Sequence, residues 1–252
     1  MTSPRRARTV VEVSDPYANY LLQVPPSGEG VCITCHSSVY DGYERCLPCN
    51  RARQKLGALV FDATAFVSLA PSGQQLAREL LTYKKEEIPE RYRHPRMAGL
   101  AAVLWRWLSV HEAHVAQGAG TPGFSMVTSV PSTRGRPGEH PLKRLVSGIV
   151  AGTGDRYVDL LETHGGDRGR EVATDRFTVV RPVTAASVLV IDDTWTSGAR
   201  AQSAAAALKL AGASKVGFVG VGRWFNADFA DNAKWLIRRR RTRWNWDRCC
   251  LE

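Results

Sequence analysis

Two neighbouring carboxylates follow a run of aliphatic residues in segment 188–199, VLVIDDTWTSGA. The aliphatic run predicts a buried strand, and the alanines after the segment predict a helix. Ligands bind beyond the carboxyl ends of parallel strands, and the N–H groups at a helix N-terminus bind anions. Asp192 and Asp193 would then face a hydroxyl-rich group beside a bound phosphate, and a ribose 5-phosphate meets both conditions. The residues predicted to hold the phosphate are Thr194, Trp195, Thr196, Ser197, Gly198 and Ala199.

A helix cap is the simpler interpretation of the same residues. Aspartate and threonine side chains commonly accept hydrogen bonds from the first N–H groups of a helix. A cap accounts for one aspartate and one threonine. It does not account for the second aspartate or for the rest of the hydroxyl-rich loop, and we therefore favour the phosphate-site hypothesis.

A second loop with anion-binding character follows segment 124–130, FSMVTSV, which we expect to be a buried strand. Its basic residues are Arg134 and Arg136, and guanidinium groups bind phosphate oxygens well. Each arginine alone fits a solvated basic turn equally well. The candidate binding residues in this loop are Pro131, Ser132, Thr133 and Arg134.

Four of the six cysteines form two C-x2-C pairs near the N-terminus, Cys32 with Cys35 and Cys46 with Cys49. Two such pairs predict a tetrahedral zinc site, and four protein ligands make that site structural because none of its positions is open. We expect zinc to stabilise this short segment. His36 is a possible substitute ligand, although we expect a solvated side chain there. We expect free thiols at Cys249 and Cys250.

Strands and helices alternate along the second half of the chain, which predicts an α/β fold with an open parallel sheet flanked by helices. We divide the chain into an N-terminal segment with a zinc-binding module (1–57), a main domain (58–237) and a basic tail (238–252). The expected strands are 58–70, 124–130, 157–162 (the weakest), 187–192 and 214–222, and the expected helices are 74–85, a helix from Pro89 onward, 140–150, 197–212 and 225–238.

The formal net charge is +10, and much of the excess lies in the tail, where Arg238 to Arg241 are consecutive. Cations interleaved with Trp244 and Trp246 suit single-stranded nucleic acid. A solvated basic helix end, with the tryptophans covering the core, explains the same pattern.

No stretch reaches the roughly 18 apolar residues of a membrane span. The chain begins without an apolar export signal, and we expect a cytoplasmic protein.

Segment 188–199 resembles the 5-phosphoribosyl pyrophosphate (PRPP) motif of the type I phosphoribosyltransferases. The resemblance implies that Asp192 and Asp193 are catalytic residues that bind the ribose hydroxyls of PRPP. It also implies that the loop after 124–130 holds pyrophosphate, and that Mg²⁺ accompanies the ligand. Arg200 stands where the family often has threonine. Lys84 and Arg170 are further candidates for pyrophosphate contacts.

A four-cysteine module before such a domain resembles the ComF (competence protein F) family. Segments 79–87, 130–146 and 168–177 agree with that family, although Glu139-His140-Pro141 replaces its Phe-Asn-Gln. The first hypothesis is a phosphoribosyltransferase with an unspecified acceptor. The alternative is a non-catalytic protein that binds PRPP or a nucleotide and assists DNA uptake or repair in competence. A regulatory protein that responds to PRPP is a third hypothesis.

Overall fold

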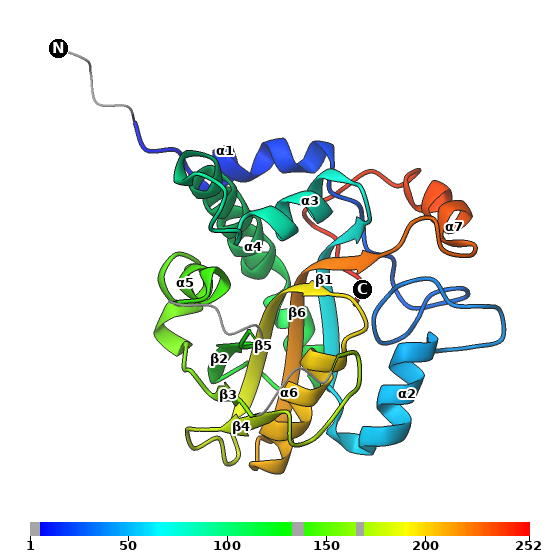
Figure 1. Ribbon diagram of the computed structural model, residues 1–252, viewed down its shortest axis with the longest axis vertical. Coiled ribbons are helices and arrows are strands. Elements are labelled where there is room, and N and C mark those ends of the chain that lie inside the picture. Colours follow the sequence, from blue (N-terminus) through cyan, green and yellow to red (C-terminus); the bar gives the residue numbers. More distant parts are fainter. Residues whose placement is uncertain (1–5, 133–138, 165–168) are drawn as a thin grey trace.

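The computed structural model describes residues 6–132, 139–164 and 169–252, and its centre is a four-stranded parallel sheet (Figure 1). The strand order is β1-β6-β5-β2, and every neighbouring pair is parallel. The two inner strands, β5 and β6, are buried along nearly their whole length, as expected where helices cover both faces of a parallel sheet. The sheet strands are β1 (Ala63–Pro71), β2 (Met126–Ser129), β5 (Ser187–Trp195) and β6 (Lys215–Phe225).

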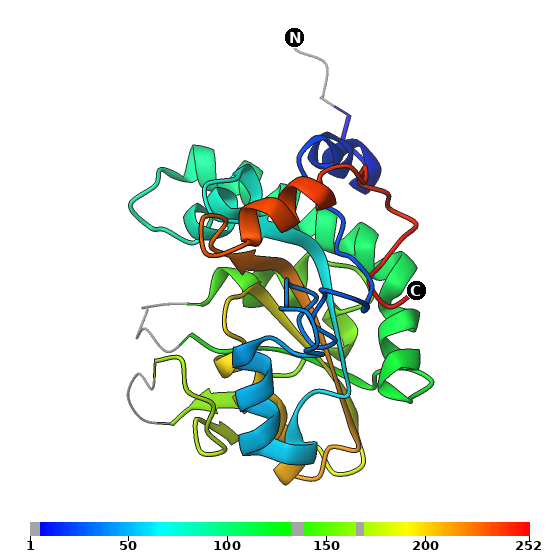
Figure 2. The same cartoon turned by 90° about the vertical axis from the view of Figure 1, so that its right-hand side faces the viewer.

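Helices lie on both sides of this sheet, with α4 along one face and α2 and α6 along the other (Figure 2). Half of the residues of α6 are alanine and most of the helix is buried, and these small side chains allow the helix to approach the sheet closely. The helices are α1 (Val10–Ser14), η1 (Asp15–Asn19), α2 (Leu47–Leu56), η2 (Gly57–Leu59), α3 (Gln75–Thr82), α4 (Glu90–Ala119), α5 (Pro141–Gly148), η3 (Gly154–Arg156), α6 (Ala199–Leu210) and α7 (Asn232–Arg239).

The α/β class and the parallel sheet are therefore confirmed, but one expected strand lies elsewhere. Segment 157–162 contributes only an isolated bridge, Val127 with Tyr157, to the main sheet. Its end forms β3 (Leu161–Thr163), which pairs antiparallel with β4 (Phe177–Val179) in a separate ribbon. The weak apolar pattern predicted that the segment is extended, but it did not predict which strand the segment pairs with.

Two strands continue well past the ends predicted for them. Strand β5 continues past the aspartates to Trp195, because Trp195 still pairs with Arg223 of β6. Strand β6 likewise continues to Phe225, which pairs with Pro71, so helix α7 begins at Asn232 and not at Phe225. Pairing with a neighbouring strand thus fixes both ends.

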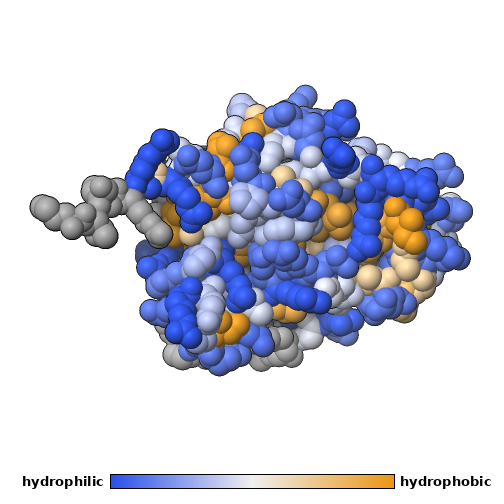
Figure 3. All heavy atoms as spheres, turned by 90° about the horizontal axis from the view of Figure 1, so that it is seen from above, coloured by the Kyte–Doolittle hydropathy of each residue, from blue (hydrophilic) through white to orange (hydrophobic). Residues whose placement is uncertain are grey.

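The cysteine segment and the segment after α7 share one hydrophobic core with the sheet, since Cys32, Cys49 and Cys250 belong to the same buried cluster as Val190 and Phe218. Seen from above, the molecular surface is mostly hydrophilic, with apolar side chains in small separate groups (Figure 3). No described helix is both long enough and apolar enough to cross a membrane.

Candidate functional site

Asp192 and Asp193 are both buried near the end of β5. The Oδ2 atom of Asp193 accepts hydrogen bonds from the hydroxyl of Tyr83 and from Nζ of Lys84, each at 2.6 Å. The Oδ1 atom of Asp192 accepts the N–H of Asp193 at 2.9 Å. Sequence reasoning named Lys84 as a candidate for pyrophosphate contacts but did not single out Tyr83. The side chain of Tyr83 is buried, but its hydroxyl donates a hydrogen bond to the acidic pair.

The two carboxyl groups have opposite electrostatic environments. Burial, together with the charge of Asp193, raises the pKa of Asp192 to about 7. Burial also acts to raise the pKa of Asp193, but the ammonium of Lys84 and the hydrogen bonds from Lys84 and Tyr83 outweigh it and hold that pKa below its usual value. Near neutral pH the pair therefore contains one ionised carboxylate and one carboxyl group that readily takes up a proton.

The turn between β5 and α6 is only three residues long, from Thr196 to Gly198. Thr196 is exposed and Ser197 is half-buried, and the Ser197 hydroxyl accepts the N–H of Ala199 at 3.4 Å. Gly198 has a φ of +77°, and a Cβ there would lie 2.2 Å from the ring of Trp195. Glycine is required both by this backbone conformation and by the close approach of the indole.

The Trp195 side chain points into the core and not toward solvent. Its ring packs against Phe66 at 5.6 Å and against Phe218 at 4.9 Å between ring centroids. Within the described part of the chain its Nε1 has no hydrogen-bond partner. Of the predicted phosphate-loop residues, Trp195 can therefore offer a ligand only its backbone, whereas Thr194, Thr196 and Ser197 keep partly or fully exposed side chains.

The second predicted loop meets the first through Arg200, which donates from Nη2 to the carbonyl oxygen of Pro131 at 2.9 Å. Its Nε has no hydrogen-bond partner among the residues described. Pro131 and Ser132 are half-buried, while the predicted binding residues Thr133 and Arg134 lie outside the described residues. Arg200 therefore links the two loops, and its buried Nε is without a partner among the described residues.

Two other basic residues, His140 and Arg170, lie in the segments that sequence reasoning compared with the family. His140 caps α5 in its neutral form, because its Nδ1 then accepts the N–H of Leu142 at 3.3 Å. In its protonated form, the charge of His140 lowers the pKa of Asp193. Arg170 is exposed. The structure thus places His140, which sequence reasoning noted only as a family departure, within electrostatic range of the acidic pair.

The four predicted cysteine ligands meet as the spacing requires, with all four sulfur atoms within 4.8 Å of one another. Cys32 and Cys35 are fully buried, and the Sγ atoms of Cys35 and Cys46 are 3.6 Å apart. Four converging thiols suit a tetrahedral ion, so the cluster can bind a structural metal ion such as zinc. We expected a solvated His36, but it is buried and its Nδ1 lies 3.1 Å from the carbonyl oxygen of Pro25.

A buried arginine connects the cysteine cluster to the strand that carries the aspartates. Arg223 of β6 donates to the Cys35 sulfur at 3.2 Å and to the Trp195 carbonyl oxygen at 3.3 Å. The guanidinium supplies positive charge beside four thiols, an arrangement that fits their ionised, metal-bound form.

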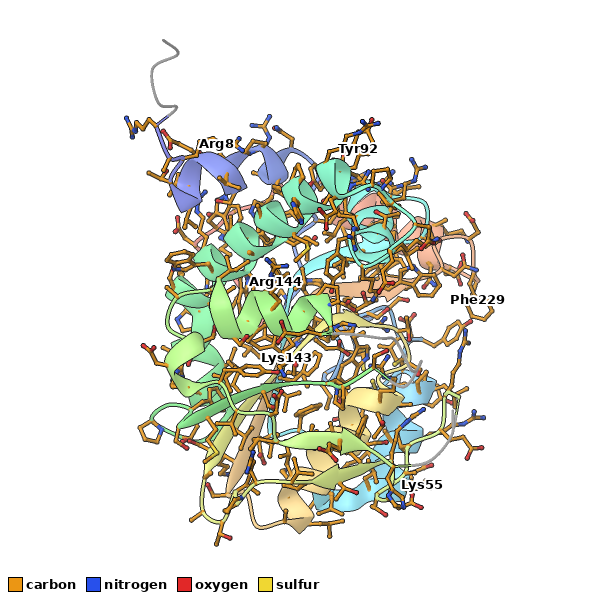
Figure 4. The ribbon with its side chains drawn as sticks, turned by 60° about the vertical axis from the view of Figure 1, so that its left-hand side comes forward. Arg8, Lys55, Tyr92, Lys143, Arg144 and Phe229 are labelled. Atoms are coloured by element: carbon orange, nitrogen blue, oxygen red, sulfur yellow. The ribbon has the colours of Figure 1, made fainter. Side chains whose placement is uncertain are left out.

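Two cavities lie away from the acidic pair and its loops. One, of about 340 Å³, lies between α1, α4 and α5 and is bordered by Arg8 and Arg144, both marked in Figure 4. The other, of about 320 Å³, is bordered by Cys249 and Glu252. At the acidic pair, Lys84 and Tyr83 both contact the Oδ2 atom of Asp193, so a ligand hydroxyl could bind that oxygen only by displacing one of them.

In comparisons with known proteins, no family model, no curated protein and no solved structure matches the chain.

Proposed function

We propose that the chain is a ComF-like protein of the type I phosphoribosyltransferase kind, which binds PRPP with Mg²⁺ and transfers the phosphoribosyl group to a nitrogen acceptor. The observation that carries the proposal is the buried pair Asp192 and Asp193 near the end of β5, the strand that leads through the short turn at Gly198 to the N-terminus of α6. A carboxylate pair beside a helix N-terminus can bind a sugar diol and its phosphate together.

Binding would exchange one partner of Asp193 for another. Lys84 neutralises this carboxylate through a 2.6 Å contact, and its side chain is one-quarter exposed. A ribose diol would replace the ammonium at Asp193, and Lys84 would then be free to contact the pyrophosphate. The positive charge that would bind the pyrophosphate is therefore already present beside the carboxylate, on the ammonium of Lys84.

Arg200 would supply a second positive contact. It already bonds to Pro131, the first residue of the loop predicted to hold pyrophosphate, and its Nε lacks a hydrogen-bond partner among the described residues. Pyrophosphate departure leaves positive charge on the ribose, and a fixed carboxylate stabilises that charge without having to reorganise. Mg²⁺, held mainly by the ligand's own oxygens with the carboxylates of Asp192 and Asp193 nearby, would neutralise the leaving pyrophosphate.

A thermal-shift titration with Mg²⁺ and PRPP tests binding, because a ligand of the native state raises Tm by mass action. We expect a shift with PRPP, a smaller one with ribose 5-phosphate, and none for the double variant D192N/D193N. An identical response of variant and wild type contradicts the proposed site. Pyrophosphate release measured across a panel of bases and amines then tests transfer, and binding without release would favour the non-catalytic alternative.

The exposed arginines after and within α7 favour a second candidate, a nucleic-acid-binding accessory protein. Arg238, Arg240, Arg241 and Arg243 are all exposed. The nearby tryptophans are half-buried: the guanidinium of Arg106 lies 4.2 Å from the Trp246 ring centroid, and Trp244 packs edge-on against Trp246. Binding would therefore depend on arginine–phosphate contacts more than on stacking of bases on these rings.

A further inference from the structure

A second group of side chains that could bind a metal ion lies where α4 meets the segment after α7. His111 and His114 of α4 meet Cys249 and Glu252, which belong to the segment after α7. One ligand atom from each of the four residues lies within 4.8 Å of every other. Figure 2 shows this end of the chain beside α4. The residues come from two distant parts of the sequence, so no local spacing in the sequence indicated this cluster.

The ring of His111 is held in the orientation of a metal ligand. Its Nε2 lies 2.8 Å from the carbonyl oxygen of Trp246. A carbonyl oxygen only accepts hydrogen bonds, so in the neutral ring Nε2 carries the proton and Nδ1 presents its lone pair. Histidines that bind metal commonly donate their other ring N–H to a backbone carbonyl in this way. His111 is fully buried, so solvent water does not occupy that lone pair.

The Nδ1 lone pair of His111 faces three further atoms that could bind a metal ion. Its Nδ1 lies 3.3 Å from Nδ1 of His114. That nitrogen lies 3.0 Å from a carboxylate oxygen of Glu252 and 3.6 Å from the sulfur of Cys249. Ligand atoms of a tetrahedral zinc ion, with bonds of about 2.0–2.3 Å, lie roughly 3.3–3.8 Å apart. The cluster is therefore close to the size that one ion requires.

Hydrogen bonding alone accounts poorly for this arrangement. A single proton on Nδ1 of His114 faces three acceptors: the Glu252 oxygen, the Cys249 sulfur and Nδ1 of His111. One cation at the centre would satisfy all of them at once. The second oxygen of Glu252 already accepts the N–H of Cys249 at 3.0 Å, which orients the carboxylate.

The chemistry of the ligands indicates the metal. Two imidazoles, one thiolate and one carboxylate suit a borderline cation such as zinc better than Mg²⁺ or Ca²⁺, which prefer oxygen alone. Side chains of His114 and Glu252 are 33% and 39% exposed, and a cavity of about 320 Å³ borders Cys249 and Glu252. An ion therefore has a path into the cluster from solvent.

We propose that His111, His114, Cys249 and Glu252 form a second zinc site, separate from the four-cysteine cluster, which fastens the segment of residues 244–252 to α4. The ligand atoms are Nδ1 of both histidines, Sγ of Cys249 and a carboxylate oxygen of Glu252. The ion would hold in place the segment that carries Trp246 against Arg106 and buries Cys250 in the core.

Zinc content after reconstitution of the full chain and removal of free metal tests this site. We expect two zinc ions per chain in the wild type, one for each cluster, and one in H114N and in C249S. The control H94N changes an exposed histidine of the same helix and should keep both ions. One ion in the wild type, or two in both H114N and C249S, overturns the proposal.

A third variant keeps the test valid if loss of the buried thiol or of His114 impairs folding. Glu252 is partly exposed, so E252A should fold with an unchanged circular dichroism spectrum. We expect it to lose the second zinc to a chelator at least about 10-fold more readily than the wild type, as removal of metal-site partners typically does. Cobalt(II) adds a spectroscopic measurement, because C249S should lose one thiolate-to-metal band while the four-cysteine site keeps its own. Equal retention of metal by E252A and the wild type overturns the proposal.

Discussion

The guanidinium of Arg223 donates to Cys35 twice, from Nε to the carbonyl oxygen at 3.1 Å and from Nη2 to the sulfur at 3.2 Å. The arginine is buried, next to four cysteines that together would carry more negative charge than one zinc ion neutralises. The same side chain reaches Trp195 at the end of β5. The cysteine cluster is thereby joined electrostatically to the strand that carries the acidic pair.

The first prediction concerns this arginine. R223M should lower the stability of the zinc-loaded protein by about 3–5 kcal/mol, because it removes one partner of a buried charge pair. It should also speed the loss of zinc to a chelator, since the thiolates lose their nearby positive charge. Chemical denaturation and chelator-release rates measure the two effects. Zinc release at the wild-type rate would show that Arg223 does not stabilise the metal-bound cysteines.

The second prediction separates the two aspartates by the sign of their effect on stability. D192N should raise Tm at pH 8, because it removes a buried carboxylate whose pKa is raised to about 7. D193N should lower Tm at the same pH, because Lys84 and Tyr83 lose the anion that they contact. Thermal melts of both variants without ligand measure this difference, and equal shifts of the same sign would contradict it.

The third prediction is the pH dependence of that difference. The native state holds a proton on Asp192 up to about pH 7, whereas the unfolded state releases it near 3.8. Between about pH 4 and 7 the unfolded state therefore gains free energy by ionising this carboxyl group while the native state keeps it protonated, and the fold loses stability as pH rises. For Asp193 the pKa is lowered, so its contribution to stability is present above the unfolded value and is lost as pH falls through the folded value. The gain from D192N should therefore be large at pH 8 and small at pH 4.5. A gain that does not change between those pH values would contradict the raised pKa.

The fourth prediction tests the turn before α6. G198A should destabilise the protein by about 1–3 kcal/mol, because Gly198 has a φ of +77° and a Cβ would meet the Trp195 ring at 2.2 Å. It should also weaken the thermal response to PRPP. G123A is the control, since a Cβ at Gly123 meets no atom within 4 Å. Equal behaviour of the two variants would show that the glycine at the turn is not required.

The fifth prediction concerns nucleic acid. If the exposed arginines bind a single strand, the affinity should fall with salt, and changing Arg238, Arg240, Arg241 and Arg243 to glutamine should reduce the log–log slope by roughly 2–3. Fluorescence anisotropy with a labelled oligonucleotide at several salt concentrations measures the slope. A wild-type slope near zero would exclude binding dominated by phosphate contacts.

Local patterns were sufficient for the elements that are hydrophobic along their whole length. The aliphatic run before Asp192 became β5, and the alanine-rich segment became α6, because a strand buried on both faces and a helix packed close to it each restrict the side chains they can hold. The spacing of the four cysteines also predicted their meeting, since a short segment can bring two such pairs together by itself.

The sequence by itself determined the α/β class, the cysteine cluster and the position of the acidic pair beside a helix N-terminus, because each depends on residues close together in the chain. Only the tertiary structure decided that Tyr83 and Lys84 cover Asp193, that Trp195 turns inward, and that Arg223 reaches Cys35. Only the tertiary structure places His111 close to Cys249. These contacts join residues far apart in sequence, and they follow from strand register and helix packing, which the whole core fixes together.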